Sequence, residues 1–498
     1  MTDSPKIEQA HPLLRESESS SRSSFEYSPD AIEFDRNGDP DNPLEWPSSY
    51  KWGIVALLSF MGFTITFTCI SIAPIAGYIV DDLKGGPRSP GSKSATVVLV
   101  TIWELGESVG PFFIAPLSEI FGRYRVYMIM NTMFIIAIVF AALSPNTGLL
   151  LISRALMGIS VASNVLNPAI IGDMFIPEQR GTAITMIMFI PLAGATVGPV
   201  ISGAILQMLG WRAIMWISVA MAAICQVMFL KFFQETYQVQ ILRRRAARLN
   251  QEIGASEKNS HHRIDWTGLR SSAIRPVVVL CNSGVIGALL LFGSFVFSHF
   301  YIVTTTLPDI LGNVYGLSPT ATGLAFTANA VGTLASFAIS KVLLDRIYIK
   351  LRSLNNGKGL PEYRLPLSII GGLTLPPAVI LYGWCAEYKL PLFVLLFTMV
   401  WLRTSMMLAI SPLTAYIVDS CGIYSASAIA SLVSARCLAS AVLPLSISRL
   451  TGRLGYSGGF YVLGGLGLAS TLLPILIYRH GEKWRQRSWY TSSISQSR

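Results

Sequence analysis

The feature that most constrains the fold of this chain is a series of apolar runs of about 20 residues, each long enough to cross a bilayer. Inside lipid, every backbone polar group must be satisfied within the chain, so runs of this length predict transmembrane helices. Only 13% of the 498 residues are charged, about half of the fraction in soluble domains. The sequence therefore predicts an all-α membrane protein with twelve transmembrane helices, near residues 52–76, 95–116, 126–144, 148–172, 182–206, 213–233, 276–306, 318–344, 365–386, 391–418, 424–450 and 460–478.

Lysine and arginine residues are distributed unevenly between the loops, and this distribution predicts the orientation. They are concentrated between the sixth and seventh runs, after the eighth run and after the last run, whereas the alternate loops are short and poor in basic residues. Because basic loops stay in the cytoplasm, we expect both termini and the central loop on the cytoplasmic side. The same loops account for the net charge of +10. With no soluble basic face carrying interleaved aromatic residues, we expect no nucleic-acid partner.

The long basic segment divides the twelve runs into six and six. We expect a Ser-rich, disordered cytoplasmic tail over 1–50, a six-helix half over 51–233, a cytoplasmic central loop over 234–275, a second six-helix half over 276–478 and a cytoplasmic tail over 479–498. Two six-helix pseudo-repeats are typical of duplicated transporters, in which the substrate site lies between the halves near the membrane midplane.

The sequence shows none of the motifs that would indicate an enzyme. Its six cysteines lie mostly within apolar runs and have no paired spacing, which indicates small core residues rather than disulfides or metal ligands. A nucleophile elbow, a metal-ligand cluster and a phosphate-binding loop are all missing. We therefore expect no cofactor, no metal and no enzymatic activity, and no transport driven directly by ATP.

A glycine-rich stretch in the fifth run reads G-A-T-V-G-P-V-I-S-G, from Gly194 to Gly203. Gly194, Gly198 and Ser202 recur every four residues, so they lie close to one face of a helix. A face without large side chains lets a neighbouring helix approach closely, which favours association in lipid, and Pro199 bends the helix. We expect a tightly packed bend, which could seal a transport path or serve packing alone.

Charged residues inside the apolar runs are the candidates for proton coupling. Glu104 and Glu107 lie one helical turn apart in the second run, and Arg154 lies in the fourth. A charge at the bilayer centre costs at least about 2.5–3.5 kcal/mol, so each of these should face the bundle interior and have a partner. A carboxylate that moves between a dry environment and an arginine could load and release a proton. The alternative is a structural pair, in which a glutamate binds Arg154 and fixes the helix packing.

Aromatic residues and two further arginines are candidates for a substrate cavity. Aromatic side chains are dense in the first and seventh runs, and a cavity that they line would suit bulky amphipathic compounds. Packing in the core or against lipid is the alternative for each of them. The two arginines lie in the tenth and eleventh runs and could hold an anionic substrate or bind backbone carbonyls at a bend. The cavity candidates are Phe63, Phe67, Phe292, Phe295, Arg403 and Arg436.

The loop after the second run carries a short charged motif, A-P-L-S-E-I-F-G-R-Y-R, from Ala115 to Arg125. Gly122 permits a tight turn, and Glu119 and Arg123 place opposite charges at the cytoplasmic mouth. Such charges can connect neighbouring helices in one state and release them in another. Arg125 could equally serve only as a topology anchor.

Several of these stretches together resemble signatures of the major facilitator superfamily, in the form found among fungal drug:proton antiporters. The 115–125 loop resembles the loop signature of that superfamily, with Ile120 where relatives often have a basic residue. The glycine-rich stretch resembles the antiporter signature, with Ser202 in place of the first of the paired glycines. The resemblance covers about residues 39–485, and further matches are L-I-S-R-A-L-M-G at 151–158, D-M-F-I-P-E-Q-R-G at 173–181 and A-Y-I-V-D at 415–419.

The resemblance implies the major facilitator fold and a proton-coupled exporter of small organic compounds that works by alternating access. The implied substrates are drugs, toxins, polyamines or secondary metabolites, and the implied partners are that substrate, protons and the lipid bilayer. We expect a monomer in the plasma membrane, with the vacuolar membrane as the alternative. The resemblance assigns a gating loop to Glu119, Gly122, Arg123 and Asp173, and an antiporter helix face to Gly194, Gly198, Pro199 and Gly203.

Two other functions stay open at this stage. A nutrient or sugar importer of the same superfamily is the first; sugar porters usually carry a P-E-S-P-R-like run after the sixth span, where this chain has Q-E-T-Y, so export is favoured. The second is a membrane receptor built on a transporter fold. Such receptors tend to carry long cytoplasmic extensions, and the tail over 479–498 is short.

Overall fold

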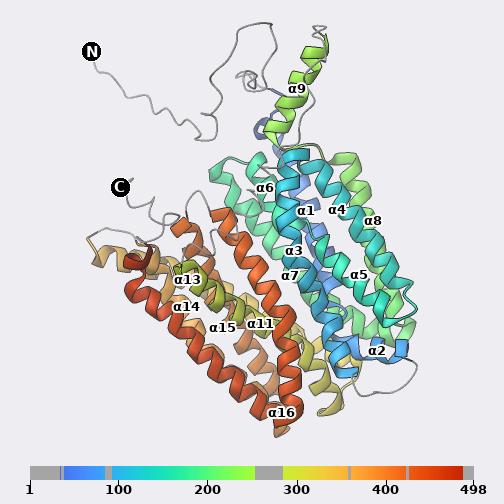
Figure 1. Cartoon of the computed structure of the whole chain (residues 1–498), viewed down its shortest axis with the longest axis vertical. Helices are drawn as coiled ribbons and strands as arrows, with labels where there is room; N and C mark the ends of the chain where they lie inside the picture. The colour runs from blue at the N-terminus through green and yellow to red at the C-terminus, as the bar shows by residue number, and fades with distance from the viewer. Residues whose placement is uncertain are drawn as a thin grey trace.

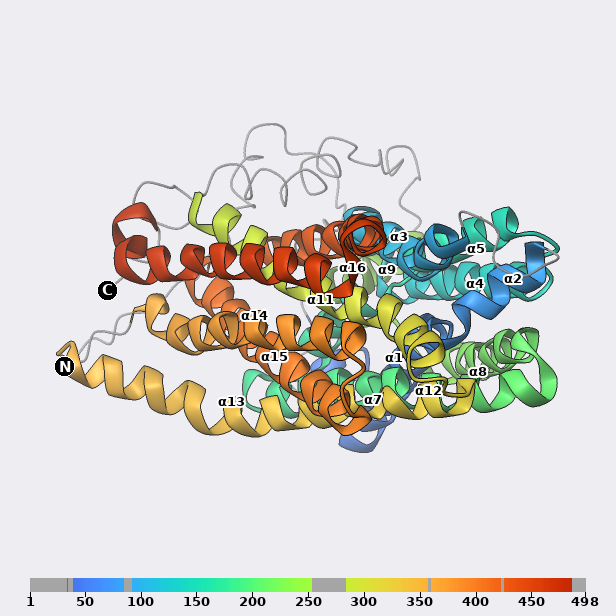
Figure 2. The same cartoon turned by 90° about the horizontal axis from the view of Figure 1, so that it is seen from below.

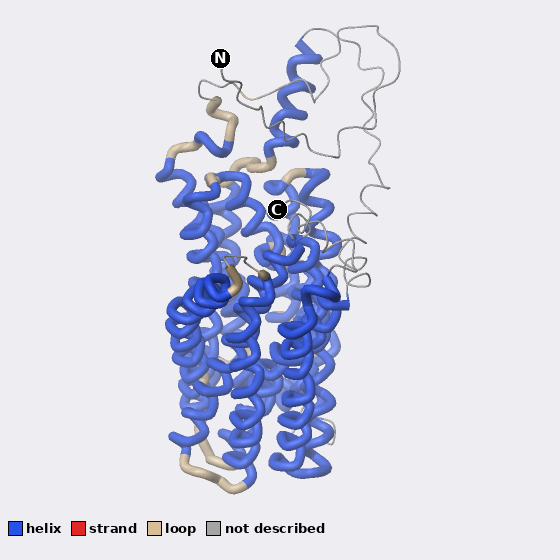
Figure 3. Tube along the Cα trace, turned by 90° about the vertical axis from the view of Figure 1, so that its left-hand side faces the viewer, coloured by secondary structure: helices blue, strands red, loops and turns tan. Residues whose placement is uncertain are grey.

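The structure is a computed structural model that describes residues 34, 39–84, 92–252, 284–356, 360–421 and 425–485. Over these residues it is built from helices and contains no strand (Figures 1 and 3). The first half comprises α1 (Ser48–Ile70), α2 (Ala76–Lys84), α3 (Ser92–Phe121), α4 (Arg123–Ala142), α5 (Thr147–Ile159), α6 (Ser163–Met174), α7 (Pro177–Leu209) and α8 (Trp211–Phe232). After α9 (Gln238–Glu252), the second half comprises α11 (Gly284–Asn313), α12 (Pro319–Ala325), α13 (Thr327–Leu354), α14 (Leu365–Glu387), α15 (Leu392–Cys421) and α16 (Ser425–Arg485).

Ten helical segments of the described chain are long and apolar enough to cross a membrane. The segment Ala428–Gly481 within α16 has 54 residues, enough for two crossings, and Gly455, with a φ of +75°, interrupts the helix between them. The fourth expected span is divided into α5 and α6, which are separated at residues 160–162. These elements together account for the twelve expected spans and confirm the predicted all-α membrane fold.

Two parts of the predicted cytoplasmic segments are more ordered than we expected. Residues 39–46 belong to the predicted disordered tail, yet they form a turn and the 3-10 helix η3 (Pro43–Glu45). Asn42 caps this helix, and Asp39 forms an ion pair of 2.6 Å with Arg245 of α9. The Asp39 carboxylate therefore fixes this stretch to α9, which lies in the segment that we expect to be the central loop. Residues 1–33, 35–38, 253–283 and 486–498 lie outside the described residues.

Buried apolar side chains form two cores, one in each half. The first core draws on residues 46–233 together with Tyr301, and the second on residues 285–477 together with Ala73. Figure 2 shows the corresponding bundles, blue to green and yellow to red, side by side. Tyr301 of α11 and Ala73, in the 3-10 helix η4 (Ala73–Ile75), therefore lie where the two halves meet.

The two ends of the bundle differ. One end bears α9 and the arginines that begin α4 and α14, and we call it the basic end; the other bears α2, and we call it the opposite end (Figure 1). Among the described residues, the polar contacts between the halves lie at mid-depth or at the opposite end. Lys93 lies 3.5 Å from Asp309, and Thr320 donates a hydrogen bond to the carbonyl of Gly203. An ion pair and a hydrogen bond therefore join the halves at the opposite end, in addition to the packing of α3 against α16.

Candidate functional site

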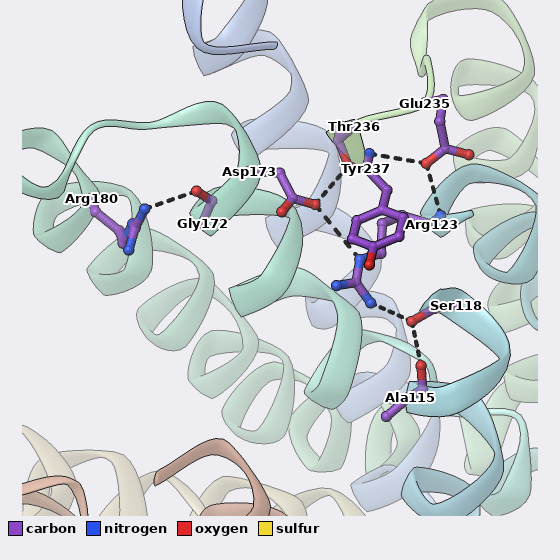
Figure 4. A network of polar contacts seen from close by, with 9 residues as sticks. All are labelled: Ala115, Ser118, Arg123, Gly172, Asp173, Arg180, Glu235, Thr236 and Tyr237. Atoms are coloured by element: carbon purple, nitrogen blue, oxygen red, sulfur yellow. Dashed lines mark hydrogen bonds and ion pairs between the residues drawn. The ribbon is translucent and has the colours of Figure 1, made fainter. Parts of the chain in front are cut away.

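The loop signature forms a polar network at the basic end (Figure 4). Arg123 begins α4 directly after Gly122, whose φ of +94° is unfavourable for any residue with a side chain. The Nε atom of Arg123 lies 3.6 Å from Oδ2 of Asp173, at the end of α6. Its Nη1 donates to the hydroxyl of Ser118, and its guanidinium lies over the ring of Tyr237. Arg123 thus connects three separate helices of the first half.

Glu235, just after α8, is the second acid of this network. Its Oε1 accepts hydrogen bonds from the backbone N–H groups of Arg123, at 2.8 Å, and Tyr237, at 3.1 Å. The first N–H groups of a helix have no partner within the helix, so this carboxylate caps the positive end of α4. A Cβ atom at Gly122 would lie 2.1 Å from Oε2 of Glu235, so the cap also requires a glycine at that position.

Asp173 is the carboxylic acid of this network whose pKa is raised by burial. It lies outside the ten candidate spans, and its Oδ2 accepts a hydrogen bond from the Thr236 hydroxyl. Burial raises the pKa of Asp173 to about 6, although the nearby Arg123 opposes that shift. The sequence pattern predicts that Glu119 supplies the negative charge near Arg123. In the structure Glu119 is exposed, and the carboxylates that contact Arg123 are those of Asp173 and Glu235.

The second half repeats this arrangement at residues that the sequence interpretation did not select. Arg364, at the start of α14, forms an ion pair of 2.5 Å with Asp419, at the end of α15. Its guanidinium lies over the ring of Tyr348 at 4.9 Å, the same separation as between Arg123 and Tyr237. The A-Y-I-V-D run that ends at Asp419 was the signal that could have identified this pair.

Arg154 is fully buried and binds backbone carbonyls. It donates to the carbonyls of Thr68 and Cys69, the last turn of α1, and to that of Leu99 in α3. The final carbonyls of a helix have no partner within it, so a cation is favoured there. The arginine also lies 4.9 Å from the Trp103 ring. Within the described residues Arg154 forms no ion pair with a glutamate. It contributes to helix packing by binding the carbonyls at the end of α1.

The two glutamates of α3 have different surroundings. Glu107 is half-buried and accepts a hydrogen bond of 3.0 Å from the Trp103 indole. Glu104 is only 3% exposed, and its interacting neighbours include Tyr301, Arg436 and Cys437, all from the second half. Glu104 is therefore a buried acid at the boundary between the halves. No group of three or more His, Cys, Asp or Glu side chains in the described ranges could hold a metal ion.

The aromatic candidates divide between the core and the boundary. Phe63 stacks on Phe67 in α1 with ring centroids 6.2 Å apart, whereas Phe292 is buried in the core of the second half and Phe295 packs on His299. The α11 aromatics that contact both cores are instead Phe297 and Phe300. Each of these two rings carries one arginine at 4.4 Å, Arg436 over Phe297 and Arg403 over Phe300.

The glycine face of α7 packs against two different neighbours. Cβ atoms at Gly194 and Gly198 would lie 2.5 and 3.1 Å from carbonyls of α1, within the same half. A Cβ at Gly203 would instead lie 2.4 Å from the carbonyl of Pro319 in the second half. In return, a Cβ at Gly323 of α12 would lie 2.2 Å from the carbonyl of Pro199. We call this reciprocal contact of Pro199, Gly203, Pro319 and Gly323 the α7–α12 seam.

Comparison with known proteins agrees with this architecture. The family described as Major Facilitator Superfamily matches residues 53–444. The chain is 31% identical to the MFS transporter cpaT of Aspergillus oryzae over 471 residues, which cover 94% of each protein. It is 30% identical to the efflux pump radE of Floropilus chiversii, covering 92% of this chain and 86% of that protein.

A solved structure supports the same fold. The crystal structure of a D-xylose-proton symporter superposes with a TM-score of 0.67 at 18% identity, covering 85% of this chain and 97% of that one. The family match covers most of the chain and includes both charge networks as far as Asp419. The chain therefore belongs to the major facilitator superfamily, and it is a multi-pass membrane transporter rather than an enzyme.

Proposed function

We propose that this protein exports small organic compounds in exchange for protons, by alternating access. The observation that carries this proposal is the position of Glu104, a buried acid of the first half that faces Tyr301, Arg436 and Cys437 of the second half. If the halves separate at this boundary, the carboxylate exchanges those neighbours for water, and its affinity for a proton changes. Similarity to the proteins named as a transporter and an efflux pump supports export.

The direction of transport follows from the expected orientation. With the basic end in the cytoplasm, the contacts at the opposite end would hold the outer side closed in a state that takes up substrate from the cytoplasm. A substrate would enter between the halves from that side. Rocking of the halves would then separate Lys93 from Asp309 and open the α7–α12 seam, while a proton enters from outside and reaches Glu104.

The two arginine networks at the basic end would act as braces in this cycle. Arg123 with Asp173 fixes the first half, and Arg364 with Asp419 fixes the second. Each ion pair lies within one half, so it keeps that half rigid while the boundary between the halves changes. We further propose that the protein works as a monomer in the plasma membrane, within the domain limits expected from the sequence.

Growth of yeast provides the test. The full chain is expressed in a strain that lacks its own exporters, and growth is measured across a panel of toxic compounds with and without a protonophore. We expect resistance to at least one compound, and we expect the protonophore or Glu104→Gln to abolish it. Resistance that persists with the protonophore would contradict proton coupling. Improved growth on a sugar, with no gain of resistance, would favour an importer and overturn the proposal.

A further inference from the structure

Arg403 of α15 is a buried cation at the boundary between the halves. The residue is 7% exposed, and its guanidinium lies 4.4 Å from the centroid of the Phe300 ring. Phe300 packs against the cores of both halves, and it is separated from Phe297, the ring that carries Arg436, by 6.5 Å between centroids. Arg403 thus lies beside the path that a substrate would take between the halves.

The packing of α13 against α15 fixes the position of this arginine. A Cβ atom at Gly332 would lie 2.8 Å from Cβ of Arg403 and 2.6 Å from the carbonyl of Val400, so the absence of a side chain there permits the close approach. The Nε atom of Arg403 donates a hydrogen bond of 3.0 Å to the hydroxyl of Thr333. The guanidinium is therefore preorganised and does not depend on a ligand for its orientation.

No acidic residue in the described part of the chain compensates the charge of Arg403. Besides the hydrogen bond of Nε to Thr333, its Nη1 has a 4.0 Å contact with the sulfur of Met406. Tyr301 is the titratable group that interacts with it electrostatically. Arg436 differs, because Glu104 and Glu107 are among its electrostatic neighbours. A buried charge is costly without a counter-charge, so Arg403 is the arginine at this boundary that still requires one.

We propose that Arg403 binds an anionic group of the substrate, and that the protein favours compounds that join an aromatic or other apolar body to one carboxylate. This deepens, and rests on, the proposed export function. The planar guanidinium suits the two oxygens of a carboxylate, and Phe300 offers an apolar surface for the attached body. Thr333 binds the inner nitrogen Nε, and Nη1 has only the long contact with the Met406 sulfur. The outer nitrogens can therefore bind a substrate anion, which would satisfy the charge that the fold leaves uncompensated.

A matched pair of dyes tests this proposal. Rhodamine 110 carries a free carboxyl group, and rhodamine 123 is its methyl ester, so the two share one aromatic, cationic xanthylium body and differ only in the carboxylate. Binding of each dye to the full-length protein in lipid nanodiscs is measured by fluorescence polarisation. We expect the wild type to bind the acid more tightly than the ester by about tenfold, the scale of one hydrogen bond to a charged group. We expect Arg403→Gln to remove this preference, and Arg403→Lys to retain part of it.

Two control variants separate ligand binding from packing. Arg436→Gln removes a stacked arginine that already has acidic neighbours. Thr333→Val removes a hydroxyl that accepts from Arg403 and donates to the carbonyl of Asn329, and leaves the guanidinium itself in place. We expect both to keep a preference for the acid, and melting temperatures report whether each variant is folded. If Arg403→Gln does not fold, the partial preference of Arg403→Lys decides.

The outcomes also separate this proposal from the export function. Equal binding of acid and ester by the wild type, or a preference that survives in Arg403→Gln, would overturn the carboxylate site. If the wild type binds neither dye but confers resistance in the yeast assay, the carboxylate site is overturned and export stands. If it confers no resistance and binds neither dye, both proposals fail together.

Discussion

Replacing Gly323 by alanine should shift the protein away from the state closed at its opposite end. The new Cβ would lie 2.2 Å from the carbonyl of Pro199, about 1.2 Å nearer than ordinary van der Waals contact, which begins at 3.4 Å. Overpacking of this kind costs about 1–3 kcal/mol. If the α7–α12 seam separates when the outer side opens, the whole cost falls on the closed state. The ratio of closed to open protein should then fall by about 5- to 150-fold.

Distance measurements between spin labels can detect this shift. Labels on cysteines at Tyr78 of α2, which is 52% exposed, and at Gly312 of α11, where a Cβ would meet nothing within 4 Å, report the separation of the halves at the opposite end. The native cysteines are first replaced. Gly181→Ala is the matched control, since it lies in the same helix as Pro199 and its Cβ would also meet nothing within 4 Å. An unchanged distance distribution in a folded Gly323→Ala variant would refute the argument that the seam closes the outer side.

Three further predictions concern single charged residues. Glu104→Gln should abolish proton-driven efflux from cells, and Glu107→Gln should reduce it less because Glu107 is held by Trp103; unchanged efflux in both would remove the proton-coupling hypothesis. Arg154→Met should lower the melting temperature of the purified protein, since each lost hydrogen bond to a charged group is worth about 1.5–3 kcal/mol; a normal melting temperature would show that capping of α1 is dispensable. The Asp173 carboxyl has a pKa of about 6, so its ion pair with Arg123 should be complete above that pH and lost below it. Transport should therefore weaken as the pH on the basic side falls from about 7 to 5. If the same pH dependence of transport persists in Asp173→Asn, this carboxyl is not its cause.

The sequence was sufficient for the fold. Runs of apolar residues predict helices whatever their neighbours are, and the basic loops predict an orientation. The sequence did not predict which helices pack together, because a periodic pattern identifies the packed face of a helix but not the helix that it packs against. The spacing of Gly194, Gly198 and Ser202 predicted a close approach. Nothing in the sequence indicated that Gly203 would contact the other half, or that Gly323 completes the seam.

The charged partners show the same limit. The motif around Arg123 directed attention to Glu119 a few residues away, whereas the structure uses Glu235, 112 residues along the chain. The sequence likewise favoured a glutamate as the partner of Arg154, because ion pairs are the usual solution for a charge in a membrane. Here the backbone carbonyls at the end of α1 bind Arg154 instead. Because every residue has a backbone carbonyl, a sequence does not show which carbonyls will bind a buried arginine.

The contrast between contacts within the halves and contacts between them explains how such a molecule can move. The pairs Arg123 with Asp173 and Arg364 with Asp419 join helices of one half, and both arginines are mostly buried. Among the described residues, Lys93 and Asp309 form an ion pair between the halves at the opposite end, and the Lys93 side chain is 71% exposed. An exposed pair of this kind contributes about 0–1 kcal/mol to stability. The α7–α12 seam adds contact without large side chains that would have to repack. The contacts at the opposite end therefore add little to the cost of separating the halves there, whereas distortion within a half would break partly buried ion pairs. This difference favours motion of the halves as two rigid bodies.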